Sequence, residues 1–449
     1  MKKTIFMMMA LMMSVTMMAE DHVLAATHGS RHDERLETPD SLTLSLAEAQ
    51  NYAIKQNRSL KNASLAVQEA YAARWQTIAA MLPQVDGSIG KTIMYDDSLR
   101  VKTVDVFGPP MSMSPWTFNA QVAIGFNGQG IVGALLKSIA IDMKKLSLEQ
   151  SESQLRGNVM SMYVSVLALQ SISNILDSSL VNIQGLEAMT QKAVEAGASE
   201  QTAADQIRVR VNNLKNSINA QQRSIVLAYN SLKVLLDVPV ETTLVLTEDM
   251  AAILSPERVI TLLSENFAIE NNLNYQLLQK QVEIAKANVH LAGWAYGPTV
   301  SAYGQYTKRV YGKGETGFEM MSSPYTVGLT VSVPIWSSGK RAAGVIEKQI
   351  ALEEAKNTLS ETTDNLQIQY RQLCFNLTNA YETYVTEKEN KAVSERIFAS
   401  STNKFKYGAA SNLELTNASN DLLNANSAYI QAILSLVNAQ VELENFLNN

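Results

Sequence analysis

Two segments of the chain alternate strictly between apolar side chains and polar or small ones. From Trp116 to Phe126 the even-numbered residues are apolar, and from Tyr325 to Ile335 the odd-numbered residues are. Because successive side chains of a strand point to opposite faces, each segment predicts a strand with one apolar face. Each is long enough to cross a bilayer as a tilted strand of about 9 to 11 residues.

Two further segments predict partner strands for these two. Val85, Ile89 and Ile93 mark one of them, and a weaker pattern covers 300–310. We therefore expect four strands, over residues 84–95, 116–126, 299–310 and 325–335. One such strand alone fits a soluble sheet equally well. Aromatic residues near both ends, as in interfacial girdles, favour membrane strands; the membrane-interface aromatics are Tyr95, Trp116, Phe126, Tyr311, Tyr325 and Trp336.

Two proline-free spans, 116–238 and 335–449, predict long helices. A proline inside a helix costs about 3 kcal/mol, so its absence leaves these spans free to be helical. Each pattern breaks at a glycine, Gly197 or Gly408, and then resumes, which predicts a helical hairpin with glycine at its tip. At about 1.5 Å per residue, the first helix of each hairpin reaches roughly 100 Å. In the first span, apolar residues recur at spacings of three and four and predict one buried face: Val159, Met162, Val166, Leu169, Ile172, Leu176, Leu180, Ile183, Leu186 and Met189.

The two halves of the chain are repeats of one plan. Residues 53–57 (AIKQN) match 268–272 (AIENN), and Pro83 matches Pro298 in the same order. We expect a first repeat over 42–237, a linker over 238–256 and a second repeat over 257–449. A capping box of Ser45 and Glu48 opens the first repeat, and Ser255-Pro256 starts a short helix that leads into the second. The predicted helix–strand junctions are Pro83, Gly130, Pro298 and Gly339.

The first residues predict export. Lys2 and Lys3 precede an apolar run up to about Met18, which is typical of a signal peptide over 1–25 with cleavage after Ala19 or Ala25. A permanent anchor is the alternative, but the run is short for one. Residues 26–41 are polar and predict a flexible segment. No later segment offers about 18 consecutive apolar residues, so we expect membrane entry through strands only.

Composition argues against several kinds of function. The formal net charge is −6, which argues against a nucleic-acid-binding surface. Cys374 is the single cysteine and lies in a helical pattern, so neither a disulfide framework nor a lipidated N-terminal cysteine is expected. His22, His28 and His32 cluster in the N-terminal segment and are interpreted as part of a tail. With no catalytic or metal-binding pattern, we expect no cofactor and no enzyme activity.

Four strands per chain are too few for a closed membrane barrel. An open sheet edge leaves backbone groups unsatisfied in hydrocarbon, at several kcal/mol each. The barrel must therefore be shared between chains. Two chains give about eight strands, whose interior side chains nearly fill, whereas three give about 12 and leave room for a lumen. This argument favours a homotrimer.

Four segments together resemble the TolC-like outer-membrane efflux protein family, over roughly residues 42–449. They are 44–49 (LSLAEA), the prolines Pro83 and Pro298, 331–339 (VSVPIWSSG) and 407–414 (YGAASNLE). Arg58 and Leu273 depart from the family, which often has proline there. The resemblance implies a mostly α fold, in which three chains form a 12-stranded barrel in the outer membrane and an α-helical tunnel through the periplasm. It also implies a periplasmic adaptor and an inner-membrane RND or ABC-type transporter as partners, in a tripartite efflux or type I secretion system.

The hairpin tips are the candidate sites for the adaptor. Their small side chains would let another helical hairpin approach closely, although a helix reversal needs glycine in any case. The candidate docking residues are Gly197, Ala198, Ser199, Gly408, Ala409, Ala410 and Ser411. Asp205, Glu414 and Asn417 follow the tips within about two to three helical turns and are candidates for a periplasmic constriction.

Another class of function remains open from the sequence. A secreted or periplasmic α-helical scaffold or adhesin without a pore explains the long helices equally well. It does not explain strands of membrane-crossing length with aromatic ends. The cargo, whether drug, metal, amphiphile or polypeptide, is not encoded in any recognisable pattern.

Overall fold

The computed structural model describes residues 41–449, except 92, 94–102, 105–110, 113–115, 198, 311–324 and 448–449. The predicted signal peptide, the three N-terminal histidines, Tyr95, Tyr311 and Ala198 lie outside these described residues, as does the predicted flexible segment except Ser41, which belongs to a strand. The chain divides into two compact units. The first comprises Met1–Leu65, Lys145–Leu277 and Ser360–Asn449, and the second comprises Ala66–Lys144 and Leu278–Leu359.

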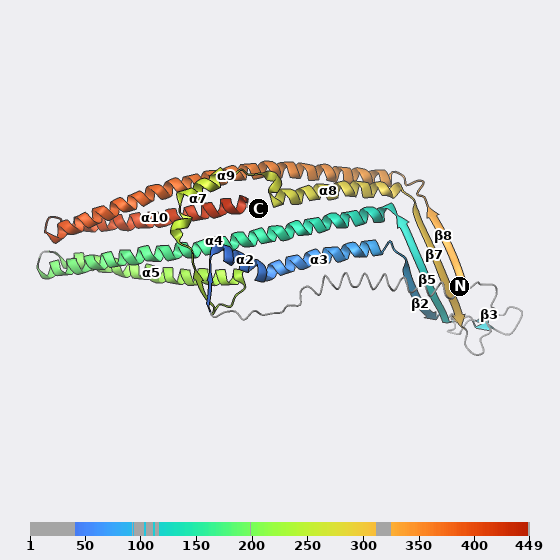
Figure 1. The fold of residues 1–449 in the computed structure, drawn as a ribbon, viewed down its shortest axis with the longest axis horizontal. Coiled ribbons are helices and arrows are strands. Elements are labelled where there is room, and N and C mark those ends of the chain that lie inside the picture. The colour runs from blue at the N-terminus through green and yellow to red at the C-terminus, as the bar shows by residue number, and fades with distance from the viewer. Residues whose placement is uncertain are drawn as a thin grey trace. The chain divides into compact units, whose positions relative to one another are not determined.

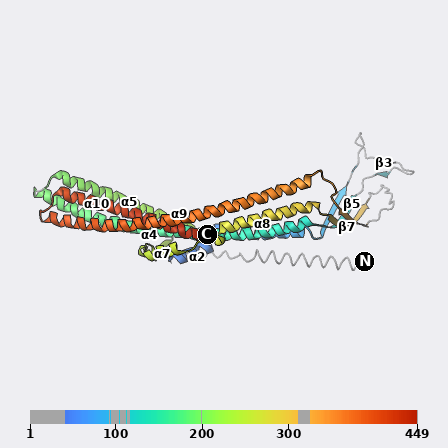
Figure 2. The same ribbon diagram turned by 90° about the horizontal axis from the view of Figure 1, so that it is seen from above.

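Two long helical hairpins dominate the chain (Figure 1). The first is made of α4 (Gly128–Glu195) and α5 (Gln201–Leu236), and the second of α9 (Lys340–Lys406) and α10 (Asn412–Leu447). In the first unit the four helices run side by side (Figure 2). The prediction of a mostly helical chain with two long hairpins is therefore confirmed.

The ten apolar positions predicted to form one face of α4 are all buried or half-buried. Six of them belong to, or pack against, two clusters. The larger contains Val159 and Leu167 of α4, Leu232 of α5 and Leu377 of α9. The smaller lies nearer the tips and joins all four helices: Ile183, Leu186, Ile207, Val211, Leu214, Ile218, Phe398, Leu415, Ala418 and Leu422. Burial of these apolar side chains holds the two hairpins together.

Helix α4 is strongly apolar over part of its length. Among the described residues, this helix contains an 18-residue stretch that is apolar enough to cross a membrane by length and composition. However, 44% of that stretch is buried inside the chain itself. We attribute its apolar character to packing against α5, α9 and α10, because the same stretch supplies Val159, Tyr163 and Leu167 to the larger cluster.

Shorter helices precede the strands in both repeats. They are α2 (Leu46–Gln56) and α3 (Arg58–Ala79) in the first, and α7 (Pro256–Ser264), the 3₁₀ turn η1 (Ile269–Asn271) and α8 (Leu273–Gly293) in the second. A further 3₁₀ turn, η2 (Trp294–Tyr296), follows α8. The predicted capping box is present at α2, and Ser255 caps α7 with Pro256 in its first turn. In the capping box, the Ser45 backbone N–H donates to the Glu48 carboxylate and lowers the pKa of Glu48.

Arg58 and Leu273, the two departures from the family pattern, are the first residues of α3 and α8. Proline is favoured at this position because the backbone N–H has no partner within the helix. Other groups define the helix start here. Asn57 accepts from Ser59 N at 2.9 Å, and Asn272 accepts from Tyr275 N at 3.2 Å. The two repeats thus share an asparagine cap, and no proline is needed.

The linker predicted over 238–256 contains a strand, β6 (Thr243–Leu246), and a short helix, α6 (Met250–Ile253). Strand β6 pairs in parallel with β1 (Ser41–Leu44). The pair is held by Tyr163, whose hydroxyl donates to Leu44 O at 3.0 Å. Sequence patterns gave no sign of this pair because four-residue strands are too short for a periodic signal.

The second unit contains a four-stranded sheet in the order β2-β5-β7-β8 (Figure 1). The strands are β2 (Gln84–Lys91), β5 (Trp116–Asn127), β7 (Thr299–Val310) and β8 (Tyr325–Ser332), all antiparallel to their neighbours. Thus one hairpin of strands comes from each repeat, and β5 pairs with β7 across the repeats. A separate small sheet pairs β3 (Thr103–Val104) with β4 (Met111–Ser112).

Two predicted strand ends need correction. Strand β8 ends at Ser332 and not at residue 335, because Pro334 has no N–H to continue the ladder. Strand β2 ends at Lys91 rather than at residue 95. Pro83 and Pro298 each stand directly before a strand, and Gly339, with φ of +81°, stands directly before α9. Gly130 lies in the first turn of α4, where its N–H donates to Asn127 at 2.7 Å.

Candidate functional site

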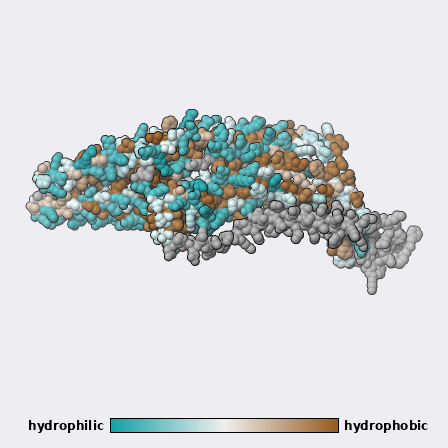
Figure 3. Space-filling view, viewed as in Figure 1, coloured by the Kyte–Doolittle hydropathy of each residue, from teal (hydrophilic) through white to brown (hydrophobic). Residues whose placement is uncertain are grey.

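The sheet has one face of exposed apolar side chains. The register places Val122 of β5 opposite Val85 of β2, and Val331 of β8 opposite Val300 of β7. Val122, Val331 and Val327 expose 41%, 58% and 87% of their surface. Brown, hydrophobic side chains also appear where the sheet is seen in Figure 3. A contiguous apolar face of this kind requires a covering other than water.

The opposite face of the sheet is polar and internally hydrogen-bonded. Gln305 Nε2 donates to Asn119 Oδ1 at 2.8 Å, and Thr307 Oγ1 donates to the same oxygen at 3.0 Å. These three side chains are half-buried. Gln121 and Thr330 lie on the same face by register. This face is therefore suited to water, while the other is suited to hydrocarbon.

Aromatic and cationic side chains gather at both ends of the strands. At the loop end, the Lys91 ammonium lies 5.5 Å from the centre of the Trp116 ring, and the rings of Tyr306 and Tyr325 lie 5.0 Å apart. At the helix end, Phe126 and Trp336 expose 58% and 85% of their surface.

The side chain of Arg341 holds the segment between β8 and α9. The Arg341 guanidinium lies 4.9 Å from the Tyr296 ring and donates to Pro334 O at 2.8 Å. It also donates to the Ser337 hydroxyl at 2.9 Å. These bonds stabilise the backbone where the strand gives way to the helix.

The tip of the second hairpin is a Schellman turn around Gly408. Ala409 N donates to Lys404 O at 2.8 Å and Gly408 N donates to Phe405 O at 3.0 Å, while Gly408 has φ of +70°. This is the left-handed conformation that glycine adopts at little cost. Gly408, Ala409 and Ser411 are exposed and Ala410 is half-buried. Residues 408–411 of the tip therefore combine small side chains with access to solvent.

The first tip has the same geometry at its glycine. Gly197 has φ of +73° and donates to Val194 O at 2.9 Å. Ser199 is half-buried. The described candidate tip residues of both hairpins thus occupy helix reversals.

The candidate constriction residues lie just beyond the tips, on the first turns of α5 and α10. Asp205, Glu414 and Asn417 are all exposed. Gln201 Nε2 donates to Asp205 at 3.0 Å, and Lys404 of α9 lies 3.9 Å from the Glu414 carboxylate. The Lys404–Glu414 ion pair joins the two helices of one hairpin, and no sequence pattern indicates it.

Below the tips, a buried polar contact joins the two hairpins. Asn426 Nδ2 of α10 donates to the Ser179 hydroxyl of α4 at 3.0 Å. Among the residues that the structure describes, no group of three or more His, Cys, Asp or Glu is arranged to hold a metal ion. Cys374 is half-buried and packs against the larger cluster. The candidate functional features are therefore surfaces: the two faces of the sheet and the two hairpin tips.

The chain thus combines two long helical hairpins with a four-stranded sheet that has one apolar and one polar face. The model of the outer membrane efflux protein family matches residues 50–237 and 266–449. The chain therefore belongs to the outer membrane efflux protein family, which is a family of channels. It is an outer-membrane channel for efflux in a tripartite system.

Solved structures share this fold. CusC, whose crystal structures concern transmembrane channel formation, has a TM-score of 0.74 at 16% identity, over 90% of this chain and 91% of that one. The outer membrane protein VceC of Vibrio cholerae has a TM-score of 0.72 at 14% sequence identity, over 90% of this chain and 96% of that one. The MtrE outer membrane channel of Neisseria gonorrhoeae, in its open state, has a TM-score of 0.69 at 13% sequence identity, over 90% of this chain and 89% of that one. A search of curated proteins by sequence gave no match.

Proposed function

We propose that three copies of the chain assemble into one conduit, to which each copy contributes four strands of a 12-stranded barrel. The observation that carries the proposal is the four-stranded sheet, which is open and ends at β2 and β8. Unpaired edges in hydrocarbon cost several kcal/mol per backbone group. Pairing β8 of one copy with β2 of the next removes both edges, and three copies leave a wide lumen.

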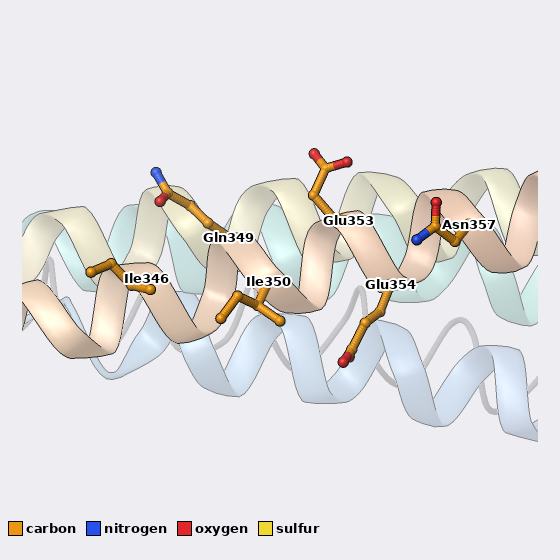
Figure 4. Close-up of a pocket in the computed structure, with 6 residues that line it drawn as sticks. All are labelled: Ile346, Gln349, Ile350, Glu353, Glu354 and Asn357. Atoms are coloured by element: carbon orange, nitrogen blue, oxygen red, sulfur yellow. The ribbon is translucent and has the colours of Figure 1, made fainter.

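A second apolar surface supports self-association. On α9, Ile346 and Ile350 lie one turn apart and expose 55% and 56% of their surface beside Glu354 (Figure 4). Farther along the same helix, Ile368 and Phe375 expose 65% and 70%. We assign this stripe on α9 to contact with a neighbouring copy, since a monomer in water would leave it uncovered.

In this proposal the barrel sits in the outer membrane, with the apolar face of the sheet toward lipid and the polar face toward the lumen. The long helices extend into the periplasm as a tunnel. The residues at the tips, Gly197 to Ser199 and Gly408 to Ser411, receive a periplasmic adaptor, which connects the conduit to an inner-membrane transporter of the RND or ABC type. Asp205, Glu414 and Asn417 narrow the entrance, so that a ring of carboxylates favours cations.

The test is fractionation followed by a mass measurement. The full chain, expressed with its own N-terminal segment, is expected in the outer-membrane fraction. Only detergent is expected to extract it from that fraction. Light scattering corrected for bound detergent is expected to give three times the mass of one chain. A stable monomer, or recovery from the soluble periplasmic fraction, contradicts the proposal and favours a scaffold or adhesin.

A further inference from the structure

Two lysines lie on the apolar face of the sheet. Register places Lys91 of β2 opposite Trp116, and Lys308 of β7 opposite Phe118, both of which belong to the apolar face. In the described strands these are the only charged residues on that face by register. Both are exposed. Among the described strand residues, no carboxylate shares this face with them.

Both lysines lie near the loop end of the strands. Lys91 is the last residue of β2, and Lys308 lies two residues before the end of β7. A charge on the lipid side of a barrel is costly at the bilayer midplane and nearly free at the interface. The position of the two lysines therefore fits the headgroup region and not the hydrocarbon.

The neighbours of the lysines fit the same depth. The Lys91 ammonium lies over the Trp116 ring, 5.5 Å from its centre, and the Tyr306 and Tyr325 rings pack together on the same face. Tryptophan and tyrosine favour the interface, and a lysine stem can lie along apolar surface while its ammonium reaches headgroups. Lys91 and Lys308 flank β5 on its two sides, about two strand spacings across and two residues along the strand from each other, so their backbones stand roughly 12 Å apart.

We propose that Lys91 and Lys308 form a binding surface for phosphate-bearing lipid headgroups at the loop end of the sheet. Lysine binds phosphate as a point charge, and two such charges attract an anionic leaflet while they repel a cationic one. The aromatic side chains fix the depth of the lysines, and the lysines select the charge of the lipid. This inference rests on the proposed insertion of the sheet into a membrane.

The test is a titration of the purified, detergent-solubilised full chain with phosphatidic acid or with phosphatidylcholine, followed by native mass spectrometry. Wild-type protein is expected to bind phosphatidic acid more tightly than phosphatidylcholine. The double variant Lys91→Gln/Lys308→Gln is expected to bind phosphatidic acid about tenfold more weakly. Restoring charge with Lys91→Arg/Lys308→Arg is expected to restore the preference.

Arg309→Gln is the matched control. Arg309 is adjacent to Lys308 in the same strand, but it pairs with Thr117 and so lies on the polar face. This variant is expected to bind phosphatidic acid as the wild type does. Added inorganic phosphate is expected not to displace the lipid.

Three results would overturn the lipid inference. They are equal binding of the two lipids by the wild type, unchanged binding by the double glutamine variant, and an equal loss in Arg309→Gln. Displacement of phosphatidic acid by inorganic phosphate would reassign the surface to free anions. The same spectra give the number of chains per particle. A monomeric particle overturns the proposed trimer whatever lipid it binds, so the two failures can be told apart.

Discussion

At Gly408 the backbone turns through a left-handed conformation, and the three residues that follow it have small side chains. If this surface receives a partner hairpin, bulk at Ala409 must block the approach. We predict that Ala409→Trp abolishes export, because the Ala409 side chain is exposed at the docking surface. The turn itself is expected to persist, because Ala409 contributes only its backbone N–H to it. Trimer assembly is expected to be unchanged, since the substitution leaves the smaller cluster and the sheet intact. Ala409→Ser serves as the control and is expected to export normally.

The readouts are export from cells, binding of the purified adaptor, and particle mass. Normal export by Ala409→Trp together with unchanged affinity for the adaptor would show that the tip is only a turn. The docking assignment would then be wrong.

Tyr163 allows a second prediction at the scale of one residue. It is fully buried in α4, and its hydroxyl donates to Leu44 O and accepts from Glu248 N at 3.4 Å. Tyr163→Phe removes this hydrogen bond while Leu44 O still accepts from Thr247 N at 3.2 Å, so the expected cost is about 0.5 to 1.5 kcal/mol in the free energy of unfolding. Denaturant unfolding followed by circular dichroism measures the loss. Tyr407→Phe is the control, because Tyr407 is 88% exposed and its change is expected to be near zero.

Individual caps could be predicted from the sequence, but long-range partners could not. The capping box of Ser45 and Glu48 depends on residues three apart, so the sequence alone reveals it. The bond from Tyr163 to Leu44, and the ion pair of Lys404 with Glu414, join residues on different elements. No periodic pattern encodes such pairs, because they depend on how the elements pack.

At the scale of elements, the two faces of each strand are expected to tolerate substitution differently. Val122→Arg places a charge toward lipid, at a cost of about 2 to 4 kcal/mol near the midplane, and is expected to impair assembly. Gln121→Arg places the same charge on the polar face, and this variant is expected to assemble with altered conduction. Val331→Arg and Thr330→Arg form the same comparison on β8. Heat-resistant trimer on gels, scored for all four variants, is the measurement; equal outcomes on both faces would refute the orientation.

Elements with a long periodic pattern were predictable and short ones were not. The faces of α4 and the alternation in β5 repeat over many residues, so their type and face follow from the sequence. The pair β1 and β6 offers too few residues for a period and lies partly in the segment expected to be a linker. The end of β8 was misplaced because the apolar alternation continues to Ile335, past the proline that stops the ladder.

The proposed conduit is a continuous passage through the whole assembly, with an entrance narrowed by carboxylates. Glu414 is exposed and pairs with Lys404 of its own hairpin. Removing it takes away both the ring of charge and one link between α9 and α10. Glu414→Ala is therefore expected to raise leak conductance and to lower the preference for cations. Gln201→Ala, which removes only a partner of Asp205, is expected to have a smaller effect.

The conductance of the purified assembly in a planar lipid bilayer shows whether this chain forms a conduit. Discrete steps that carry cations in preference to anions are expected for the wild type, and larger, less selective steps for Glu414→Ala. If wild type and Glu414→Ala both insert into the bilayer and neither gives conductance steps, this chain does not form a conduit.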